Sequence, residues 1–250
     1  MARLVLLPAL LALAAAASVA APARDPSLEA LRGAVIAIDP GHNGGNWAHP
    51  GTIARLVDAG TLRKPCDTTG AETAAGYAEH AFAFDVALRL RALLRAAGAR
   101  VVLTRRSDSG VGPCITERAA IGNRAGADAA ISIHADGGPP AGRGFHVVYP
   151  ELVPGLTDDI AGESHRLALA VRAAYRVATG LPPSTYAGSR GLAARSDLGG
   201  LNRSDVPKVL IETGNLRNPT DATLLGRPVF RQRVASGLAR GLARFLAARD

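Results

Sequence analysis

Two histidines, His42 and His134, each stand at the end of a short apolar segment, and this setting suits metal binding at the edge of a sheet. Residues 35–38 are apolar and partly β-branched, which favours a buried strand. Pro40 ends this strand because it lacks an N–H, and Gly41 permits a sharp turn that leaves His42 at the carboxyl end. Residues 129–133 repeat the pattern before His134. Ligands bind at that edge of open α/β sheets and imidazole is a common metal ligand, so the pair predicts a metal site.

Two carboxylates extend this interpretation. Glu212 ends a third apolar segment at residues 206–211, and Glu79 stands just before a long helical pattern. A catalytic zinc ion takes three N/O ligands and leaves a fourth position for water, which the set His42, Glu79 and His134 can supply. A further carboxylate must accept the proton of that water and return it to a leaving amine, and Glu212 is the candidate.

The pattern alone leaves alternatives open. Glu79 is also placed as an N-terminal helix acid that the helix dipole favours, and Glu72 is a rival ligand. Asp39 and Asp136 flank the histidines and are read as supporting or turn residues, although either is able to bind metal. The remaining histidines lack a comparable setting and are expected on the surface or in loops: His49, His80, His146 and His165.

The elements that must position these side chains follow from hydrophobic periodicity. Helices are predicted from after His80 to Gly98, over 115–127, over 159–179 and over 228–247, with further strands at 100–104 and 144–149. A strand, a helix and a neighbouring strand predict a right-handed βαβ crossover. Residues 24–32 are expected to be a mobile lead-in, and residues 43–76 and 180–203 to be long loops. We see no repeat and no interdomain linker, so residues 24–250 are expected to form a single domain.

The first 23 residues have the composition of a secretory signal peptide. Arg3 precedes an unbroken run of apolar and small residues, and a small-residue site follows at 21–23. A membrane anchor is the rival interpretation, but the apolar run is short and rich in alanine. No later segment approaches the ~20 apolar residues that a membrane span needs. The chain is therefore expected to be exported, without stable membrane insertion once the signal is removed.

Charge and aromatic content limit the partners. The formal net charge is +8, and removing residues 1–23 removes only Arg3 among the charged residues and leaves +7. An exported basic protein meets anionic surfaces such as cell-wall polymers, while a solvated Arg-rich surface explains the charge equally well. Aromatic residues make up only 4% of the chain, too few for base-stacking platforms, so no nucleic acid is expected.

The two cysteines, Cys66 and Cys114, are predicted to form a structural disulfide. A lone pair in an exported protein is more often a disulfide than a metal site, and neither cysteine neighbours a histidine. The bond would close a loop of about 49 residues and stabilise the fold by roughly 4 kcal/mol in the chain-entropy model.

Four motifs, in order and at suitable spacing, resemble the zinc-dependent N-acetylmuramoyl-L-alanine amidases of the amidase-3 group. They are Ile-Asp-Pro-Gly-His at 38–42, Thr104-Arg105 with Asp108 and Arg118, Ser-Ile-His-Ala-Asp at 132–136, and Val-Leu-Ile-Glu at 209–212. The resemblance covers nearly the whole chain after the signal. It implies one α/β domain with a twisted, mixed, mostly parallel sheet flanked by helices on both faces. It also implies one Zn²⁺ per chain bound by His42, Glu79 and His134, with Glu212 as acid/base; the family's glutamate directly precedes the first long helix, which favours Glu79 over Glu72.

The resemblance further implies a peptidoglycan hydrolase that cuts between the lactyl group of N-acetylmuramic acid and L-alanine. Peptidoglycan or muropeptides are the expected partners of a monomer in the periplasm, in the cell wall or outside the cell. Rival functions are a zinc peptidase that cuts within the stem peptide and a non-catalytic wall-binding protein.

Other positions carry narrower expectations. Arg195, Asp197 and Asn202 lie in a loop expected to contact the muropeptide. Trp47 is placed either to line a cleft or to pack within its own loop. Gly41 is expected to tolerate a side chain least. Some members of the family carry a plug helix between the His134 and Glu212 strands; here that interval holds an ordinary amphipathic helix, which predicts constitutive activity.

Overall fold

A six-stranded sheet organises the protein. The computed structural model describes Met1 and residues 26–249, so the predicted signal peptide, Met1 apart, lies outside the described residues. The strands are, in order across the sheet, β4 (Arg100–Leu103), β1 (Val35–Pro40), β5 (Ala129–Asp136), β8 (Lys208–Asn215), β6 (His146–Pro150) and β7 (Leu192–Arg195).

Strand directions create a crevice at one edge of this sheet. β4, β1, β5 and β8 are parallel, β6 runs antiparallel to β8, and β7 is parallel to β6, which confirms the mixed, mostly parallel sheet. The chain passes from β1 outward to β4 and then back across β1 to β5. Successive connections therefore diverge between β1 and β5, and ligands of open α/β folds bind at the carboxyl ends of such a strand pair.

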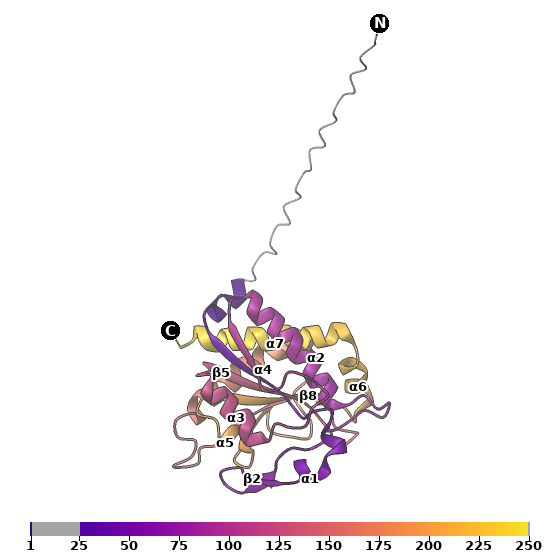
Figure 1. The fold of residues 1–250 in the computed structure, drawn as a ribbon, viewed down its shortest axis with the longest axis vertical. Helices are drawn as coiled ribbons and strands as arrows, with labels where there is room; N and C mark the ends of the chain where they lie inside the picture. Colours follow the sequence, from indigo (N-terminus) through magenta and orange to yellow (C-terminus); the bar gives the residue numbers. More distant parts are fainter. Residues whose placement is uncertain (2–25, 250) are drawn as a thin grey trace.

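Helices cover both faces of the sheet, as predicted (Figure 1). On one face α2 (Glu79–Ala96), α4 (Ala161–Thr179) and α7 (Pro228–Ala247) bury the main apolar core, to which β5 contributes Ile131 and Ile133 and β8 contributes Val209 and Ile211. The other face is covered by α3 (Ile115–Arg124) and the short α5 (Gly199–Asn202). Because side chains alternate along a strand, the residues between those core positions face the α3 side, where the candidate site lies.

The long predicted loops contain short elements. Residues 43–76 include the 3-10 helix η2 (Asn46–Ala48), the single-turn α1 (Pro50–Ile53) and a hairpin of β2 (Leu56–Asp58) and β3 (Arg63–Pro65). The predicted loop 180–203 contains β7 and α5, and α6 (Pro219–Leu225) precedes α7. The disulfide between Cys66 and Cys114 is present, confirming that prediction, and it joins the first of these segments to the start of α3.

Two predicted boundaries are wrong. The lead-in is ordered from Pro26, where the 3-10 helix η1 (Pro26–Leu31) buries Leu28 and Leu31 and packs against α7. The last strand begins at Lys208 and continues to Asn215, so Glu212 lies within the strand rather than after it. Within the described residues, no helix is long and apolar enough to cross a membrane.

Candidate metal centre

His42, Glu79 and His134 meet at the carboxyl ends of β1 and β5. One potential ligand atom from each residue lies within 4.8 Å of the other two. Oε1 of Glu79 lies 3.2 Å from Nε2 of His42 and 2.8 Å from Nδ1 of His134. The structure thus brings together the three residues predicted as ligands, while Glu72 lies outside the cluster in an isolated bridge with Ala78.

The turn that carries His42 is held in an unusual conformation. His42 has φ of +55°, a left-handed backbone that residues other than glycine adopt rarely and mostly at functional positions. Gly41 lies under the ring of His134, because a Cβ there would be 2.3 Å from Cε1 of that ring. A side chain at Gly41 would therefore displace this ring, but Gly44 has a closer approach, to the backbone of Asp108, so the structure does not single out Gly41 as the least tolerant position.

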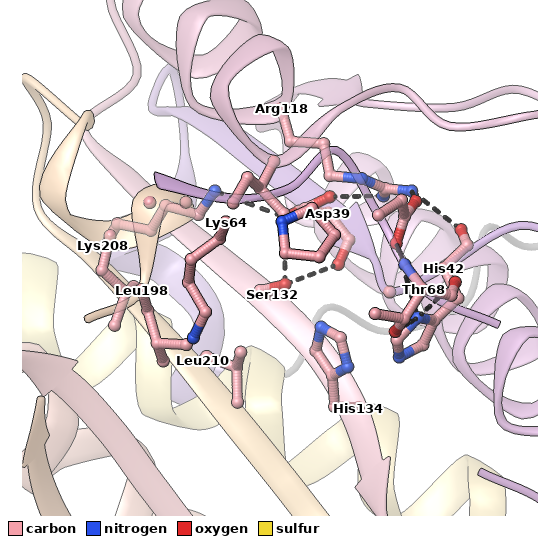
Figure 2. A pocket seen from close by; sticks show the side chains of 17 residues that line it. Asp39, His42, Lys64, Thr68, Arg118, Ser132, His134, Leu198, Lys208 and Leu210 are labelled. Carbon is pink, nitrogen blue, oxygen red and sulfur yellow. Dashed lines mark hydrogen bonds and ion pairs between the residues drawn. The ribbon is translucent and has the colours of Figure 1, made fainter. Parts of the chain in front are cut away.

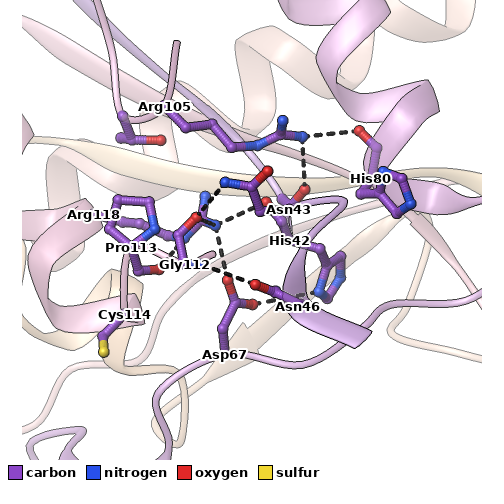
Figure 3. A network of polar contacts seen from close by, with 12 residues as sticks. His42, Asn43, Asn46, Asp67, His80, Arg105, Gly112, Pro113, Cys114 and Arg118 are labelled. Carbon is purple, nitrogen blue, oxygen red and sulfur yellow. Dashed lines mark hydrogen bonds and ion pairs between the residues drawn. The ribbon is translucent and has the colours of Figure 1, made fainter. Parts of the chain in front are cut away.

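Two buried arginines hold that turn through its backbone carbonyls (Figure 3). Arg105 donates to the carbonyl oxygens of Pro40 and Gly41, and Arg118 donates to those of Pro40 and His42. Three consecutive carbonyls therefore have charged donors, which satisfies the polar backbone of a strained turn. Sequence analysis placed both arginines in family motifs without giving them this role.

Asp39 anchors the same region. Its carboxylate accepts from Thr104 at 2.7 Å, Arg118 at 2.9 Å, Ser132 at 3.0 Å and Lys208 at 3.3 Å. Burial disfavours the charged carboxylate, but the positive charges of Lys208 and Arg118 outweigh it and place the pKa of Asp39 far below its usual range. Asp39 is therefore a supporting residue in this structure, one of the two roles that its position allowed.

Asp67, which sequence analysis did not identify, links Arg118 to His42. It accepts from Arg118 at 2.8 Å, and its other oxygen lies 3.5 Å from Nδ1 of His42. Asp67 follows Cys66 directly, so the disulfide pins the segment that carries it. No periodic signal marks this residue, because its partner lies 51 positions further along the chain.

The hydrogen bonds around the cluster determine which atoms of His42 and Glu79 can bind a cation. Nδ1 of His42 lies 3.0 Å from the carbonyl oxygen of Thr68, and since a carbonyl only accepts, Nδ1 donates there and Nε2 is the atom that can bind a cation once it gives up its proton. Glu79 accepts from the backbone N–H of Ala71 at 2.8 Å and of Ala135 at 3.2 Å, which fixes its carboxylate. Two imidazoles and an oriented carboxylate form the donor set of a catalytic zinc site.

Without a metal, the interactions within the cluster favour a positive charge on His42 and a negative charge on Glu79. Burial disfavours a charged imidazole at His42, but the negative charge of Glu79 and the hydrogen bond to Asp67 outweigh it and raise the pKa of His42 to about 10. Burial also disfavours ionised Glu79, yet the charge of His42 and the hydrogen bond to His134 hold the pKa of Glu79 far below its usual range. The carboxylate is therefore ionised, and a metal cation would take the place of the His42 proton.

Glu212 stands beside this cluster in a row of three titratable side chains. It pairs with His134 on β5 and with His146 on β6, and paired residues of neighbouring strands share one face. Burial, together with the negative charges of Glu79 and Asp136, raises the pKa of Glu212 well above its usual range. Such a carboxyl is suited to hold a proton near neutral pH.

His146 corrects one sequence-based expectation. It lies in strand β6, 5% exposed, rather than on the surface or in a loop, because β6 is an inner strand covered on both sides. Within residues 26–249, its Nδ1 and Oε2 of Glu212 are buried without a hydrogen-bond partner. Burial lowers the pKa of His146, so a neutral imidazole faces Glu212. His80 is partly exposed in the first turn of α2, with Nδ1 2.8 Å from Asp108, which is compatible with the expected surface position.

Tyr186 closes the row on the far side of His146. The two rings meet edge to face with centroids 6.2 Å apart, and burial together with the neighbouring Asp136 carboxylate raises the pKa of Tyr186 above its usual range. The ring lies against Gly138 and Gly142, where a Cβ would come within 2.4 and 2.5 Å of it. This turn is therefore shaped around Tyr186, a residue that sequence analysis did not single out.

The three residues predicted to contact substrate, Arg195, Asp197 and Asn202, differ in their burial and hydrogen bonding. Asn202 is buried and its amide donates to the carbonyls of Ala59 and Ser196, which holds the loop together. Asp197 accepts from Arg195 at 2.6 Å and from Lys64 at 2.9 Å. Arg195 is the most exposed of the three, and its positive charge acts on Glu212, so it is the one best placed to meet a ligand.

A pocket of about 200 Å³ opens from the histidines toward α5. Figure 2 shows His42 and His134 at one end and Leu198 and Leu210 at the other, with Lys64 beside them. We call it the inner pocket; its remaining lining includes the apolar Pro65, Ile115 and Leu201 and the charged Asp39, Arg118 and Lys208. α4 packs on the opposite face of the sheet, so it does not cover this entrance.

A His/Glu/His cluster with a buried glutamate at a strand-order switch point is the arrangement of a metal-dependent hydrolase. Comparison with known proteins narrows this class, because residues 36–244 match Amidase_3, N-acetylmuramoyl-L-alanine amidase. The chain belongs to this family, which confirms the resemblance seen in its motifs.

Individual relatives agree. The chain is 45% identical over 217 residues to N-acetylmuramoyl-L-alanine amidase Rv3717 of Mycobacterium tuberculosis, across 87% of this chain and 88% of that protein. The crystal structure of Ami1 from Mycobacterium smegmatis matches with a TM-score of 0.82 at 44% identity, covering 87% of this chain and 99% of that one. The apo form of Ami1 from Mycobacterium abscessus matches with a TM-score of 0.80 at 40% identity, covering 86% and 99%.

Proposed function

We propose that this enzyme hydrolyses the amide bond between the lactyl group of N-acetylmuramic acid and L-alanine in peptidoglycan. The observation that carries the proposal is the row formed by Glu212 and His134 on adjacent strands, with His42 and Glu79 completing a set of donors within 4.8 Å. Amide hydrolysis needs an activated water and a proton carrier beside it, and this row supplies a place for both.

The residues present fit one zinc ion per chain. His42, Glu79 and His134 would hold it, since His42 offers Nε2 while Nδ1 is engaged with Thr68, and Glu79 is oriented by two backbone N–H groups. A bound zinc ion supplies Lewis acidity, lowering the pKa of a coordinated water and polarising the scissile carbonyl.

Glu212 carries the proton in this mechanism. Its carboxylate accepts a proton from the attacking water as the new C–O bond forms at the lactyl carbonyl. The carboxyl then gives that proton to the alanine nitrogen as the C–N bond breaks, which leaves a lactyl carboxylate and a free L-alanine amine. Burial and the neighbouring carboxylates raise the pKa of Glu212, which favours the protonated form that the leaving amine requires.

Mass spectrometry of digested muropeptides tests the proposal. Intact stem peptides with a free L-alanine amine, released without chelator and abolished by it, are the expected products. A peptidase acting within the stem would release shorter fragments, and a non-catalytic wall-binding protein would release nothing; either result overturns the proposal.

We also propose that the chain is exported with residues 1–23 as its signal peptide. The Cys66–Cys114 disulfide supports this, because such bonds persist in oxidising compartments. The intact mass of the protein recovered outside the cytoplasm should correspond to a chain that starts at Arg24. Recovery of an uncleaved chain in the membrane fraction would favour the anchor instead.

A further inference from the structure

A second hollow lies on the other side of the metal cluster from the inner pocket. We call it the outer groove; it measures about 750 Å³ and is lined chiefly by residues 43–44, 47, 69–74 and 217. Two chain segments pass from one hollow into the other. Gly41 and His42 line the inner pocket and residues 43–44 the outer groove, while Thr68 lines the first and residues 69–74 the second.

The metal cluster lies at this junction. Nδ1 of His42 is 3.0 Å from the carbonyl oxygen of Thr68, the residue at which the lining changes. Gly70 is also close to the cluster, because a Cβ there would lie 2.8 Å from Cδ2 of His42 and 2.9 Å from Oε2 of Glu79. A substrate centred on the cluster therefore has a separate hollow in each of two directions.

The substrate of the proposed function also has two halves. The cleaved bond joins a glycan strand to a peptide, so the two parts must leave the reacting carbonyl in different directions. We propose that the outer groove is the glycan subsite and that Trp47 stacks on a sugar ring there; this inference rests on the proposed function.

Trp47 is the feature that assigns the groove to sugar. It is 74% exposed, although it is the largest side chain of the loop and the only tryptophan of the protein. Its placement rules out packing within its own loop, one of the two expectations for this residue. An exposed indole presents a flat apolar face with a polar N–H at its rim, which matches the C–H face and hydroxyl edge of a pyranose ring.

The loop holds Trp47 in place before any ligand arrives. Its neighbour Asn46 is buried, donates to the Thr68 carbonyl at 2.8 Å and accepts from the Gly112 N–H at 2.9 Å. Gly44 packs so closely on the next loop that a Cβ would lie 2.0 Å from the carbonyl oxygen of Asp108. With Asn46 fixed inward, Trp47 projects outward from a rigid turn, so binding loses little conformational entropy.

Polar groups complete the groove. Arg217 is exposed on its wall, and His80 lines it with Nδ1 directed to Asp108, which leaves the other ring nitrogen for a ligand. These groups suit sugar hydroxyls and acetamido carbonyls. The inner pocket, by contrast, is smaller, and its lining combines apolar side chains with the amines of Lys64 and Lys208, which suits the alanine methyl and the carboxylates of a stem peptide.

Because the protein has one tryptophan, its fluorescence reports directly on the groove. The full-length mature protein is titrated with a peptide-free tetrasaccharide of alternating N-acetylglucosamine and N-acetylmuramic acid, and separately with a free stem peptide. The glycan should give a saturable change in emission and the peptide none. No change with glycan, or the same saturable change with peptide, overturns the inference.

Variants of Trp47 test whether the aromatic ring itself, rather than the rest of the groove, binds the glycan. By calorimetry, Trp47→Ala should weaken tetrasaccharide binding at least tenfold and Trp47→Phe less than threefold, with unchanged melting temperatures because the side chain is exposed. Leu152→Ala, at another exposed apolar residue, is the matched control and should bind as the wild type does. Equal binding by Trp47→Ala and wild type overturns the inference.

The same samples keep the two proposals distinct. Glycan binding without release of a free alanine amine would support the groove and overturn the proposed reaction. Amide hydrolysis with no glycan response at Trp47 would do the opposite.

Discussion

Two buried polar clusters lie on the same face of the sheet and differ in how completely their atoms are paired. The Asp39 cluster comprises Asp39, Thr104, Arg118, Ser132 and Lys208, and the Glu212 cluster comprises Asp136, His146, Tyr186 and Glu212. In the first, four donors fill the acceptor positions of one carboxylate. In the second, Nδ1 of His146 and Oε2 of Glu212 lack a partner within residues 26–249.

This difference distinguishes the residues that fix the geometry of the site from those expected to take part in the reaction. Buried polar atoms are nearly always paired, and a paired network fixes a geometry. The Asp39 cluster does so for the His42 turn through Arg118. Unpaired buried atoms raise the free energy of the folded protein unless a ligand pairs them, so the Glu212 cluster is where substrate atoms are expected. Damage to the first cluster should reduce stability, and damage to the second should reduce activity.

The largest expected effect is on catalysis. Glu212→Gln preserves size but cannot accept a proton, so the rate of alanine amine release should fall about 10²- to 10⁴-fold, the usual contribution of a general acid–base. The melting temperature should not fall, because the change removes a carboxyl whose ionisation is disfavoured by burial and by the charges of Glu79 and Asp136. Amine-specific labelling of digests measures the rate. Unchanged release would contradict the role given to Glu212.

Arg118→Met should act in the opposite way. It removes the cation that pairs with both buried carboxylates, Asp39 and Asp67, and breaking a buried ion pair in this manner costs about 3–5 kcal/mol. Urea unfolding measures the loss. Arg124→Met on the same helix removes only an exposed pair with Glu117, and should change the free energy of unfolding by less than about 0.5 kcal/mol. Similar values for the two variants would break the comparison.

Reduction of the Cys66–Cys114 disulfide should lower the stability of the protein without loss of the metal. Opening a loop of this length costs roughly 4 kcal/mol in the chain-entropy model. Cys66 neighbours Asp67 rather than a ligand, so the melting temperature should fall while the folded protein still holds its metal. Calorimetry and metal analysis of the same reduced sample test this order, and loss of metal at an unchanged melting temperature would contradict it.

His146 offers a smaller effect on activity. His146→Phe keeps a ring but removes the polar atoms that face Glu212, and should lower kcat/KM about tenfold, a change of about 1.4 kcal/mol. His146→Gln retains hydrogen-bonding atoms and should recover part of the loss. If both variants lose activity equally and unfold early, His146 belongs with the supporting residues instead.

The smallest effect is a pH slope. The pKa of Glu212 is raised in the folded protein, so ionisation there opposes folding: the contribution to stability is complete below the unfolded pKa, about 4.3, and is lost as pH rises through the folded pKa. In chelated protein, the advantage of Glu212→Gln over wild type in the free energy of unfolding should therefore grow from pH 4 to pH 7. An advantage that shrinks over this range would contradict the sign of the shift.

Much of the fold could be predicted because its central elements carry strong local patterns. The apolar runs before His42 and His134 and the helical spacing of residues 82–94 correspond to β1, β5 and α2. The short elements β7, α5 and α6 were missed, because four to seven residues of mixed polarity give no periodic signal.

The residues of the site also fall into those that could be predicted from the sequence and those that could not. His42, His134 and Glu212 follow apolar runs of sequence, so their position at one edge of the sheet could be predicted from the sequence, and the family resemblance favoured Glu79 over Glu72. His146 could not be found, because its meeting with Glu212 depends on the antiparallel register of β6 against β8. Asp67 and Tyr186 are held by partners distant in the chain, Arg118 in one case and the 138–142 turn in the other.

The positions of the two ends of the described chain determine which edge of the protein would face a solid support after immobilisation. η1 packs on α7, and Arg249 donates to the carbonyl of Asp128 just before β5, so both ends lie at the edge where the parallel strands begin (Figure 1). The metal cluster lies at the edge where they finish. Immobilisation through the C-terminus would therefore turn the reacting edge away from the support, toward an insoluble polymer offered from solution.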